Sequence, residues 1–344
     1  MKSIQFLWIL VILLHFVTNS CRVDMKDKSS EPHSVNEFTG QWTIDIEGGK
    51  VGWLEVRQEN DYLDAELLWI GGSVTPVSNV YLANNEYLVV TRTRTVSFED
   101  NGNIREHIIT NLLNVFKKSE NEIYGYYLQP KTNGTGVDTT TFVGKKLPPV
   151  PEPPDLEKLE YGNPVVLFDG QDLSRWELID PEKKNGWKIV DGILVNRIPE
   201  DENSFSYSDL RTHQEFEDFN LKLEVNVPKK SNSGVYLRGM YEIQVNDSYD
   251  LPLNSHFMGA VYSRIKPTQK AEKPAGTWQS MDITLCDRHV TVILNGIKII
   301  DNQPVYGPTG DAIISDVFAP GPIYFQGNHG NISYRNIILT PIVK

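Results

Sequence analysis

Short runs of alternating apolar and polar residues dominate the chain from about residue 36 onward. The clearest run is "FNLKLEVNV" at 219–227, in which every second side chain is apolar. A period of two residues is typical of a β-strand with one buried face. "HVTVILNGIKII" at 289–300 places Asn295-Gly296 between two β-rich runs, which indicates a hairpin. Because almost no segment has a helical period, the sequence predicts an all-β protein.

A proline-rich stretch divides this pattern into two units. "LPPVPEPPDLEKLE" at 147–160 contains five prolines between residues 148 and 154, which favours a stiff, extended linker. Residues 36–146 predict a small antiparallel β-barrel or sandwich, whose Gly-Gln-Trp opening resembles the entry of lipocalin-type barrels. Residues 161–344 predict a two-sheet jelly-roll sandwich.

The N-terminus has the features of an export signal. Lys2 precedes an apolar run at 4–17, which suits a signal peptide better than a membrane-spanning helix. Ser20-Cys21 resembles a bacterial lipobox, so we expect residues 1–20 to be a lipoprotein signal peptide and Cys21 to be lipidated. Residues 21–35 would then be a polar tether. We expect a lipid-anchored protein of the cell envelope, in the periplasm or at the outer membrane, with a secreted protein as the alternative.

Charge and cysteine content limit the partners that the chain can bind and the ways in which it can be stabilised. The chain has 45 acidic and 33 basic residues and a formal net charge of -12, which argues against a nucleic-acid partner. It has only two cysteines. If Cys21 carries lipid, no disulfide can form within the chain, and both domains must rest on hydrophobic cores.

Seven motifs of the second unit occur in an order that resembles the 3-keto-disaccharide hydrolase family. The resemblance covers nearly all of residues 161–344 and none of the first domain. The motifs are "LFDGQDLSRWEL" (167–178), "WKIVDGIL" (187–194), "SDLRTHQEFEDFNLKLEV" (208–225), "NSGVYLRGMYEIQVNDSY" (232–249), "MGAVYSRIKP" (258–267), "KPAGTWQSMDITL" (273–285) and "GPIYFQGNHGNISYRNIIL" (321–339).

The resemblance implies a concanavalin-like jelly roll that acts on glycosides already oxidised to a ketone at carbon 3. The ketone acidifies the proton on carbon 2, so a base can remove it and the group on carbon 1 can leave by β-elimination. Addition of water to the product completes hydrolysis. Such a site needs a base, a proton donor, and hydrogen-bond donors or a divalent metal ion to stabilise the enolate. The substrate implies an upstream sugar 3-oxidoreductase as a functional partner.

The segment "SNSGVYLRGMYEIQVND" at 231–247 predicts a hairpin with one polar face. A loop at 239–241 would pair Arg238 with Glu242 and Tyr236 with Gln244. Spacing alone favours a solvated face with a weak ion pair. The family motif runs through these positions, so the resemblance implies a carbohydrate site. Glu242 would be the base or a metal ligand, and the other three residues would bind substrate or stabilise the enolate.

His329, in the glycine-flanked turn "QGNHGN", is the second catalytic candidate. The resemblance implies a role as proton shuttle or metal ligand, and a Glu242–His329 pair could hold a divalent ion. No local ligand spacing supports a metal independently. Three further residues are assigned to substrate binding: Asp247, Tyr262 and Gln326.

Two functions from different classes are compatible with these residues. The first is an exported hydrolase that cleaves 3-keto-glycosides. The second is a glycan-binding, lectin-like lipoprotein without catalysis, because jelly rolls of this type also serve as lectins and a fold does not fix a function.

Overall fold

The computed structural model describes residues 33–343 of the chain. The signal peptide, Cys21 and most of the tether lie outside the described residues, so their assignments stay predictions. Within the described range, no helix is long and apolar enough to cross a membrane. The helices of this range are short 3-10 turns: η1 (Val35–Glu37), η2 (Leu156–Lys158) and η3 (Ser204–Ser206).

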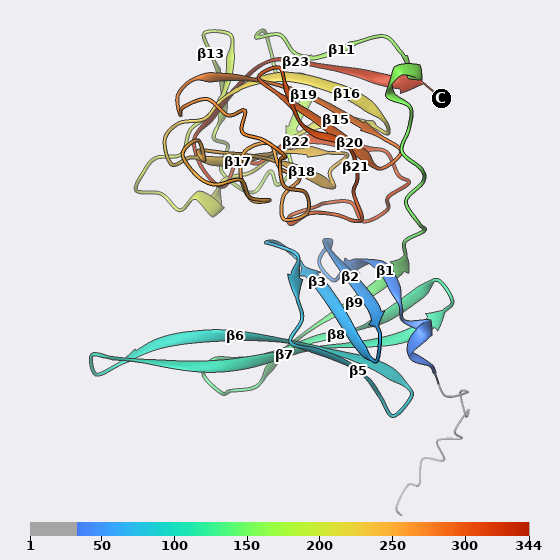
Figure 1. The fold of residues 1–344 in the computed structure, drawn as a ribbon. Coiled ribbons are helices and arrows are strands. Elements are labelled where there is room, and N and C mark those ends of the chain that lie inside the picture. The colour runs from blue at the N-terminus through green and yellow to red at the C-terminus, as the bar shows by residue number, and fades with distance from the viewer. Residues whose placement is uncertain (1–32, 344) are drawn as a thin grey trace, which may run out of the picture.

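The N-terminal domain is one antiparallel sheet of nine strands in the order β4-β3-β2-β1-β9-β8-β7-β6-β5 (Figure 1). Its strands are β1 (Gly40–Ile46), β2 (Lys50–Glu59), β3 (Tyr62–Trp69), β4 (Thr75–Pro76), β5 (Asn79–Ala83), β6 (Tyr87–Asp100), β7 (Asn103–Ser119), β8 (Glu122–Pro130) and β9 (Val137–Lys146). The sheet curls until β3 approaches β5. Across the described residues no ladder joins β4 to β5, so the domain is a curled open sheet around a core that includes Trp42, Leu54 and Phe142.

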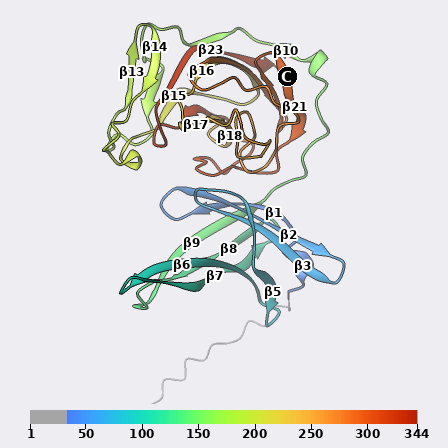
Figure 2. The same ribbon diagram turned by 60° about the vertical axis from the view of Figure 1, so that its left-hand side comes forward.

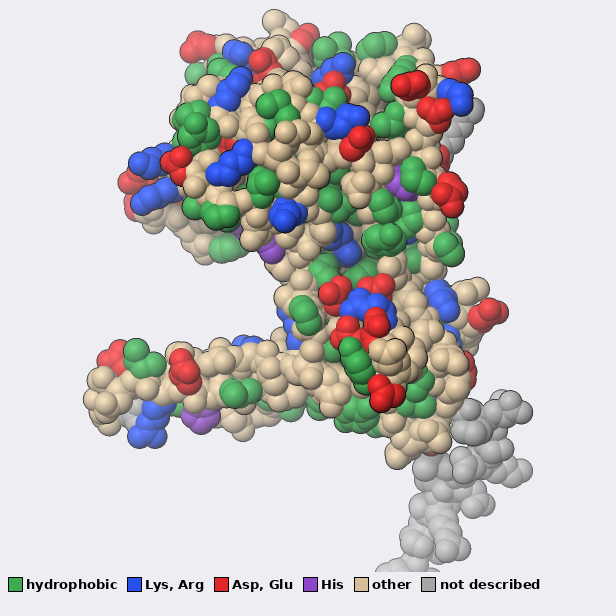
Figure 3. Space-filling view, in the orientation of Figure 1, with side chains coloured by type: hydrophobic (Ala, Val, Ile, Leu, Met, Phe, Trp, Pro, Cys, Tyr) green, Lys and Arg blue, Asp and Glu red, His purple; other side chains and the backbone are tan. Residues whose placement is uncertain are grey.

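Strands β6 and β7 extend far beyond the rest of this domain as a two-stranded arm (Figures 1 and 3). They pair from Tyr87 opposite Phe116 out to the turn at residues 101–102. β8 pairs with β7 only from Leu112 onward, so the outer part of the arm has no third strand. Figure 3 shows a wide notch between the arm and the C-terminal domain.

The C-terminal domain consists of two antiparallel sheets packed face to face. The first has nine strands: β13 (Trp187–Val190), β14 (Ile193–Asn196), β23 (Ile332–Val343), β16 (Phe219–Asn226), β19 (Trp278–Cys286), β20 (His289–Leu294) and β21 (Ile297–Pro304), with β10 (Glu160–Tyr161) and β11 (Val165–Phe168) also paired to β23. The second has five strands: β12 (Trp176–Leu178), β15 (Leu210–Phe216), β22 (Gly321–Phe325), β17 (Asn232–Leu237) and β18 (Tyr241–Asn246). This arrangement confirms the predicted all-β jelly-roll sandwich.

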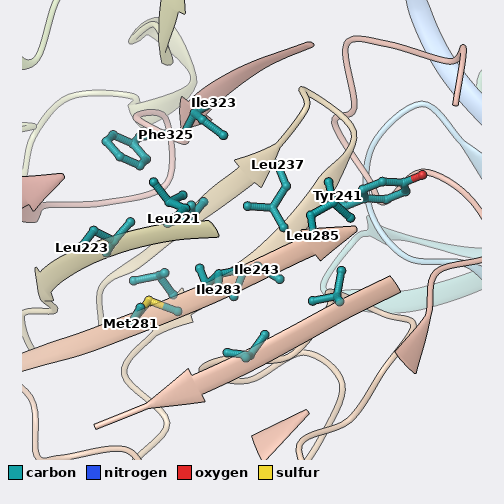
Figure 4. Packing of buried hydrophobic residues seen from close by; sticks show 14 of the residues in the cluster. Leu221, Leu223, Leu237, Tyr241, Ile243, Met281, Ile283, Leu285, Ile323 and Phe325 are labelled. Carbon is teal, nitrogen blue, oxygen red and sulfur yellow. The ribbon is translucent and has the colours of Figure 1, made fainter. Parts of the chain in front are cut away.

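Alternation along the strands builds the core between these sheets. Leu221 and Leu223 of β16 face Leu237 and Ile243 of the other sheet, and all four are at most 2% exposed (Figure 4). Burying one such side chain contributes about 1.5–3 kcal/mol, and the sandwich contains many. The core therefore fixes the five-stranded sheet and leaves its second face for other groups.

The linker runs along the C-terminal domain. The guanidinium of Arg288 donates to the carbonyl of Pro148 at 3.1 Å, and the Asn302 amide donates to the carbonyl of Pro154 at 2.9 Å. These contacts hold the extended linker against the jelly roll after β9 ends at Lys146.

The two domains also touch directly (Figure 3). Trp53 of β2 belongs to the same apolar cluster as the jelly-roll core, and its indole N–H donates to the carbonyl of Tyr306 at 3.1 Å. The backbone N–H of Val74 donates to Ser263 Oγ at 2.9 Å. The N-terminal domain is thus docked on the C-terminal domain, near β17 and β18.

Candidate active site

The face of the five-stranded sheet that points away from the core carries a row of polar side chains. Across the β17–β18 ladder Tyr236 lies opposite Glu242, and Gly234 lies opposite Gln244. Tyr324 of β22 lies beside Tyr236, and the two rings stack with their centroids 3.8 Å apart. The residue alternation that packs the core therefore gathers these groups on the other face.

The predicted register of the β17–β18 hairpin is wrong. The loop is 238–240 instead of 239–241, because Arg238 adopts a left-handed backbone with φ of 55° and belongs to the turn. Its guanidinium donates to the carbonyl of Val317 at 2.9 Å and does not pair with Glu242 across the ladder. The partners shift by two residues, so the residue parity is unchanged and the remaining polar residues still share one face.

Two expected substrate-binding residues have local partners in the structure. The amide of Gln244 donates to the carbonyl of His256 at 3.1 Å. The carboxylate of Asp247 accepts from the backbone N–H of Lys230 at 2.8 Å, which closes the turn before β17. Both side chains thus hold loops beside the polar face.

Two further residues expected to bind substrate, Tyr262 and Gln326, lie at the edges of the polar face. Tyr262 reaches the N-terminal domain, where its hydroxyl lies 3.5 Å from Ser73 Oγ. Gln326 follows β22 and is 4% exposed, and its backbone N–H donates to the carbonyl of Gly234. Its Oε1 has no hydrogen-bond partner among the described residues. A buried acceptor of this kind is available to a hydroxyl donor.

Residues 305–320, which connect β21 to β22, lie over the polar face and are called the cover segment here. Three hydrogen bonds attach it to the sheet: Glu242 N–H to Thr309 Oγ1 (2.9 Å), the Tyr236 hydroxyl to the Gly310 carbonyl (2.9 Å), and the Tyr324 hydroxyl to the Asp311 carbonyl (2.7 Å). The cover segment therefore encloses the middle of the polar face.

Glu242 is enclosed between the sheet and the cover segment and is 4% exposed. Its carboxyl group lies over Gly234, where an added Cβ would come within 2.4 Å of Oε1, so a side chain at 234 would displace it. Burial raises the pKa of Glu242 well above its usual value, although a hydrogen bond from Tyr236 opposes the rise. The shift extends the pH range over which Glu242 keeps its proton and can donate a hydrogen bond.

A cavity of about 140 Å³ lies beside the cover segment, between the two domains. Side chains of both signs face it. Its charged lining residues are Lys50, Asp180, Lys183, Asp209 and Asp311, and Ser208 and Asn328 add neutral polar groups. Convergent donors and acceptors in a small space suit a ligand with many hydroxyl groups.

Asp209 is a partly buried carboxylate in the wall of this cavity. It precedes β15, and the backbone N–H of Gly327 donates to its Oδ1 at 2.7 Å. Burial raises the pKa of Asp209 to about 6; the carboxylate of Asp311 adds to the rise, and the ammonium of Lys183 opposes it. A carboxylate with this pKa is ionised at neutral pH and is still basic enough to accept a proton.

Asp209, Lys183 and Asp311 are not among the site residues predicted from the sequence. A signal for Asp209 was present, because it precedes Arg211 by two residues and Arg211 pairs with Tyr324 on the polar face. No pattern signals the other two, because they lie in loops whose path depends on tertiary contacts.

His329 sits in a tightly packed turn at the edge of the same region. Asn196 of β14 donates from its amide to the carbonyls of Gly327 and Gly330, which fixes the turn. The His329 ring packs edge-on against Phe205 with centroids 5.4 Å apart. Burial lowers the pKa of His329, although the Asp311 carboxylate opposes the shift, so the neutral imidazole is favoured. It is available to accept a proton.

A divalent metal ion held by Glu242 and His329 is one of the predictions from the sequence. Within residues 33–343 the group of three potential ligands that converge is Asp218, Cys286 and Asp287. This group lies at the ends of β16 and β19, in the nine-stranded sheet. Glu242 and His329 are not members of this three-residue group, and their role as a pair of metal ligands stays a prediction.

Comparison with known proteins supports the family seen in the motifs. The family model described as a 3-keto-alpha-glucoside-1,2-lyase-like domain matches residues 163–340, just over half of the 344 residues. The comparison with curated proteins finds no match.

Comparison with solved structures gives matches to carbohydrate-active proteins. A proposed glycosyl hydrolase from Parabacteroides distasonis is 29% identical, with 57% of this chain and 93% of that chain covered and a TM-score of 0.41. A second such protein from the same organism is 26% identical, with 52% and 98% covered and a TM-score of 0.39. SCLam, a non-specific endo-beta-1,3(4)-glucanase of family GH16, is 8% identical, with 56% and 92% covered and a TM-score of 0.34.

The match also confirms the resemblance inferred from the seven motifs. Its span contains the polar face, the cover segment, Asp209 and His329, and leaves out the N-terminal domain. The chain therefore belongs to the family of 3-keto-alpha-glucoside-1,2-lyase-like domains and acts on glycosides.

Proposed function

We propose that the protein hydrolyses 3-keto-glycosides by removing the proton on carbon 2. The electrons of the C2–H bond form an enolate with the C3 ketone, and collapse of the enolate makes a C1=C2 double bond and expels the C1 oxygen. The leaving oxygen takes a proton. Water then adds its oxygen to carbon 1 and a proton to carbon 2, which gives the free 3-keto sugar.

Asp209 fits the base, because its carboxylate lines the cavity and has a pKa of about 6. This single observation carries the proposal, since a general base works best when its pKa lies near the working pH. Lys183 lines the same cavity, and its ammonium would stabilise the enolate oxygen.

His329 and Glu242 act beside this base. The neutral imidazole of His329 relays a proton between Asp209 and the leaving oxygen. Glu242, predicted from sequence as base or metal ligand, instead keeps its proton and supports Tyr236 and the cover segment. The directions of their pKa shifts and their burial support these two roles.

The substrate fixes the surrounding chemistry. A sugar carries a ketone at carbon 3 only after an oxidation, so an upstream sugar 3-oxidoreductase must supply the substrate. The predicted signal peptide and Cys21 would place the activity at the cell envelope. Incorporation of radioactive palmitate into the wild type, but not into Cys21→Ala, tests this; an unlabelled wild type contradicts it.

A chromogenic 3-keto-glucoside tests the activity. We expect release of the chromophore by the wild type, and near-complete loss in Asp209→Asn with unchanged circular dichroism. A parallel reaction with a chelator tests for a divalent ion, since only a metal-dependent enzyme loses turnover. Tight glycan binding without turnover would favour the lectin-like alternative and contradict the proposal.

A further inference from the structure

The N-terminal domain lies outside the family match, yet it supplies one wall of the cavity. Lys50 from the start of β2 and Ile70 after β3 face the same space as Asp209 and Asp311. Figures 1 and 2 both place β1–β3 next to the jelly roll. A substrate that reaches Asp209 is therefore enclosed by both domains.

The two walls meet where glycines leave no room for side chains. A Cβ added at Gly310 would lie 2.1 Å from the carbonyl oxygen of Gly72, so the backbones are in direct contact. A Cβ added at Gly71 would lie 2.7 Å from Asp311 Oδ1. The loop after β3 therefore limits where the carboxylate of Asp311 can lie in the cavity.

Ile70 provides an independent sign that this loop has a role. Its φ is 65°, a left-handed conformation that is rare for a β-branched residue. Strain of this kind persists only where the surroundings impose it, and it is concentrated at ligand sites. Here it holds Ile70 in the wall of the cavity.

The docking of the domain is firm enough to make this wall part of the site. The guanidinium of Arg264 lies 4.4 Å from the centre of the Trp53 ring. A Cβ added at Gly307 of the cover segment would come within 2.5 Å of the same indole. The N-terminal domain thus packs on the segment that carries Gly310 and Asp311.

The size of the cavity limits what it can enclose. Its volume is about 140 Å³. Protein cavities of about 150 Å³ hold one benzene molecule, so the space has room for no more than one sugar ring. A ring with further residues on both sides needs more space than this, and the N-terminal domain closes one side of the cavity.

We propose that the N-terminal domain is the specificity-determining wall of the active site, and that Lys50, Ile70 and Gly71 restrict it to a terminal 3-keto sugar. This inference rests on the proposed function. The substrate class is small 3-keto-glycosides with the oxidised ring at the non-reducing end. A ring within a longer chain is excluded.

Kinetics of the full chain test this wall with two substrates, a 3-keto-disaccharide and a trisaccharide whose central ring carries the ketone. For Gly71→Ala we expect KM for the disaccharide to rise about tenfold or more with a smaller change in kcat, because the new methyl displaces the Asp311 carboxylate. For Ile70→Gly we expect the ratio of kcat/KM for trisaccharide over disaccharide to rise about tenfold. Gly162→Ala is the matched control, because its Cβ would meet only Pro341 at an ordinary 3.6 Å.

Calorimetric titration with methyl 3-keto-glucoside separates this inference from the proposed function. Binding that is weakened in Gly71→Ala and Lys50→Ala but not in Gly162→Ala supports the wall, even if the wild type shows no turnover. Binding and substrate preference that are unchanged in Gly71→Ala, Lys50→Ala and Ile70→Gly overturn it. Absence of binding to the wild type contradicts both proposals.

Discussion

The polar face of the five-stranded sheet has a covered part and a rim. Residues of the covered part support the structure, whereas Asp209 at the rim is proposed to react with substrate. In the covered part, Glu242 and its neighbour Tyr236 are sealed under the cover segment. At the rim, Asp209 opens into the cavity between the domains. Burial raises the pKa of both carboxyl groups, but only Asp209 can touch a ligand there. A perturbed pKa therefore identifies a reacting group only together with access.

Among the proposed variants, Asp209→Asn should have the largest effect on activity. The amide keeps the size of the side chain and an acceptor for the Gly327 N–H, but it cannot accept the proton. We expect kcat/KM on the 3-keto-glucoside to fall about 10³-fold, within the range for loss of a general base. Steady-state kinetics measure it.

The control for this effect is Glu242→Gln in the covered part. Because Glu242 is proposed to stay protonated, its amide analogue should lower kcat/KM about tenfold or less. Equal losses in the two variants would contradict the division between rim and covered part.

The next largest effect is the pH dependence of kcat/KM in the wild type. Asp209 must be ionised to act as base, and its pKa is about 6. We expect kcat/KM to fall about tenfold per pH unit below that value and to level off above it. A rate that is flat between pH 4 and 7 would exclude Asp209 as the base.

His329→Ala should have a smaller effect, since a proton relay is partly replaced by water. We expect kcat/KM to fall about 10–100-fold and the stability to change little, because the turn is held by Asn196 and its glycine carbonyls. Stopped-flow kinetics measure the fall in kcat/KM, and thermal unfolding measures the change in stability. Full activity in this variant would remove His329 from the mechanism.

The smallest expected effect is on the free energy of unfolding. Burial raises the pKa of Asp209 from 3.8 to about 6, so its contribution to folding is fully present below pH 3.8 and is lost as the pH rises through 6. Asp209→Asn should therefore raise the free energy of unfolding at pH 7, by at most about 3 kcal/mol, and the gain should vanish near pH 4. Chemical denaturation at both pH values measures it.

Glu242→Gln should also be more stable than the wild type at neutral pH, for the same reason and with the same sign. Burial raises the pKa of Glu242, so its stabilising contribution is lost as the pH rises above the unfolded-state value. A lower melting temperature for Glu242→Gln at pH 7 would contradict this.

Local sequence patterns predict the fold much better than they predict the candidate site. Alternation in β16 placed Leu221 and Leu223 in the core correctly, because a two-residue period follows from strand geometry. Parity also placed Tyr236 and Glu242 on one face, although the loop position was wrong. Turn register depends on which residue accepts a left-handed backbone, and Arg238 was not an obvious candidate.

The cavity could not be read from the sequence. Asp311 and Lys183 lie in loops, and Lys50 and Ile70 come from a domain that the family motifs do not include. Their meeting depends on how two domains dock, which has no local period. Glu242, by contrast, was found through its motif, but its enclosure depends on the cover segment about 70 residues later, which hydrogen-bonds to it through Thr309.

The central claim is that the carbon 2 proton leaves during the reaction. Turnover of a 3-keto-glycoside in D₂O, followed by NMR of the product within minutes and compared with an enzyme-free sample of the product, tests it directly. The account predicts one deuterium at carbon 2 of the released sugar, because water returns a proton there after elimination. A product that keeps its original hydrogen at carbon 2 would contradict it.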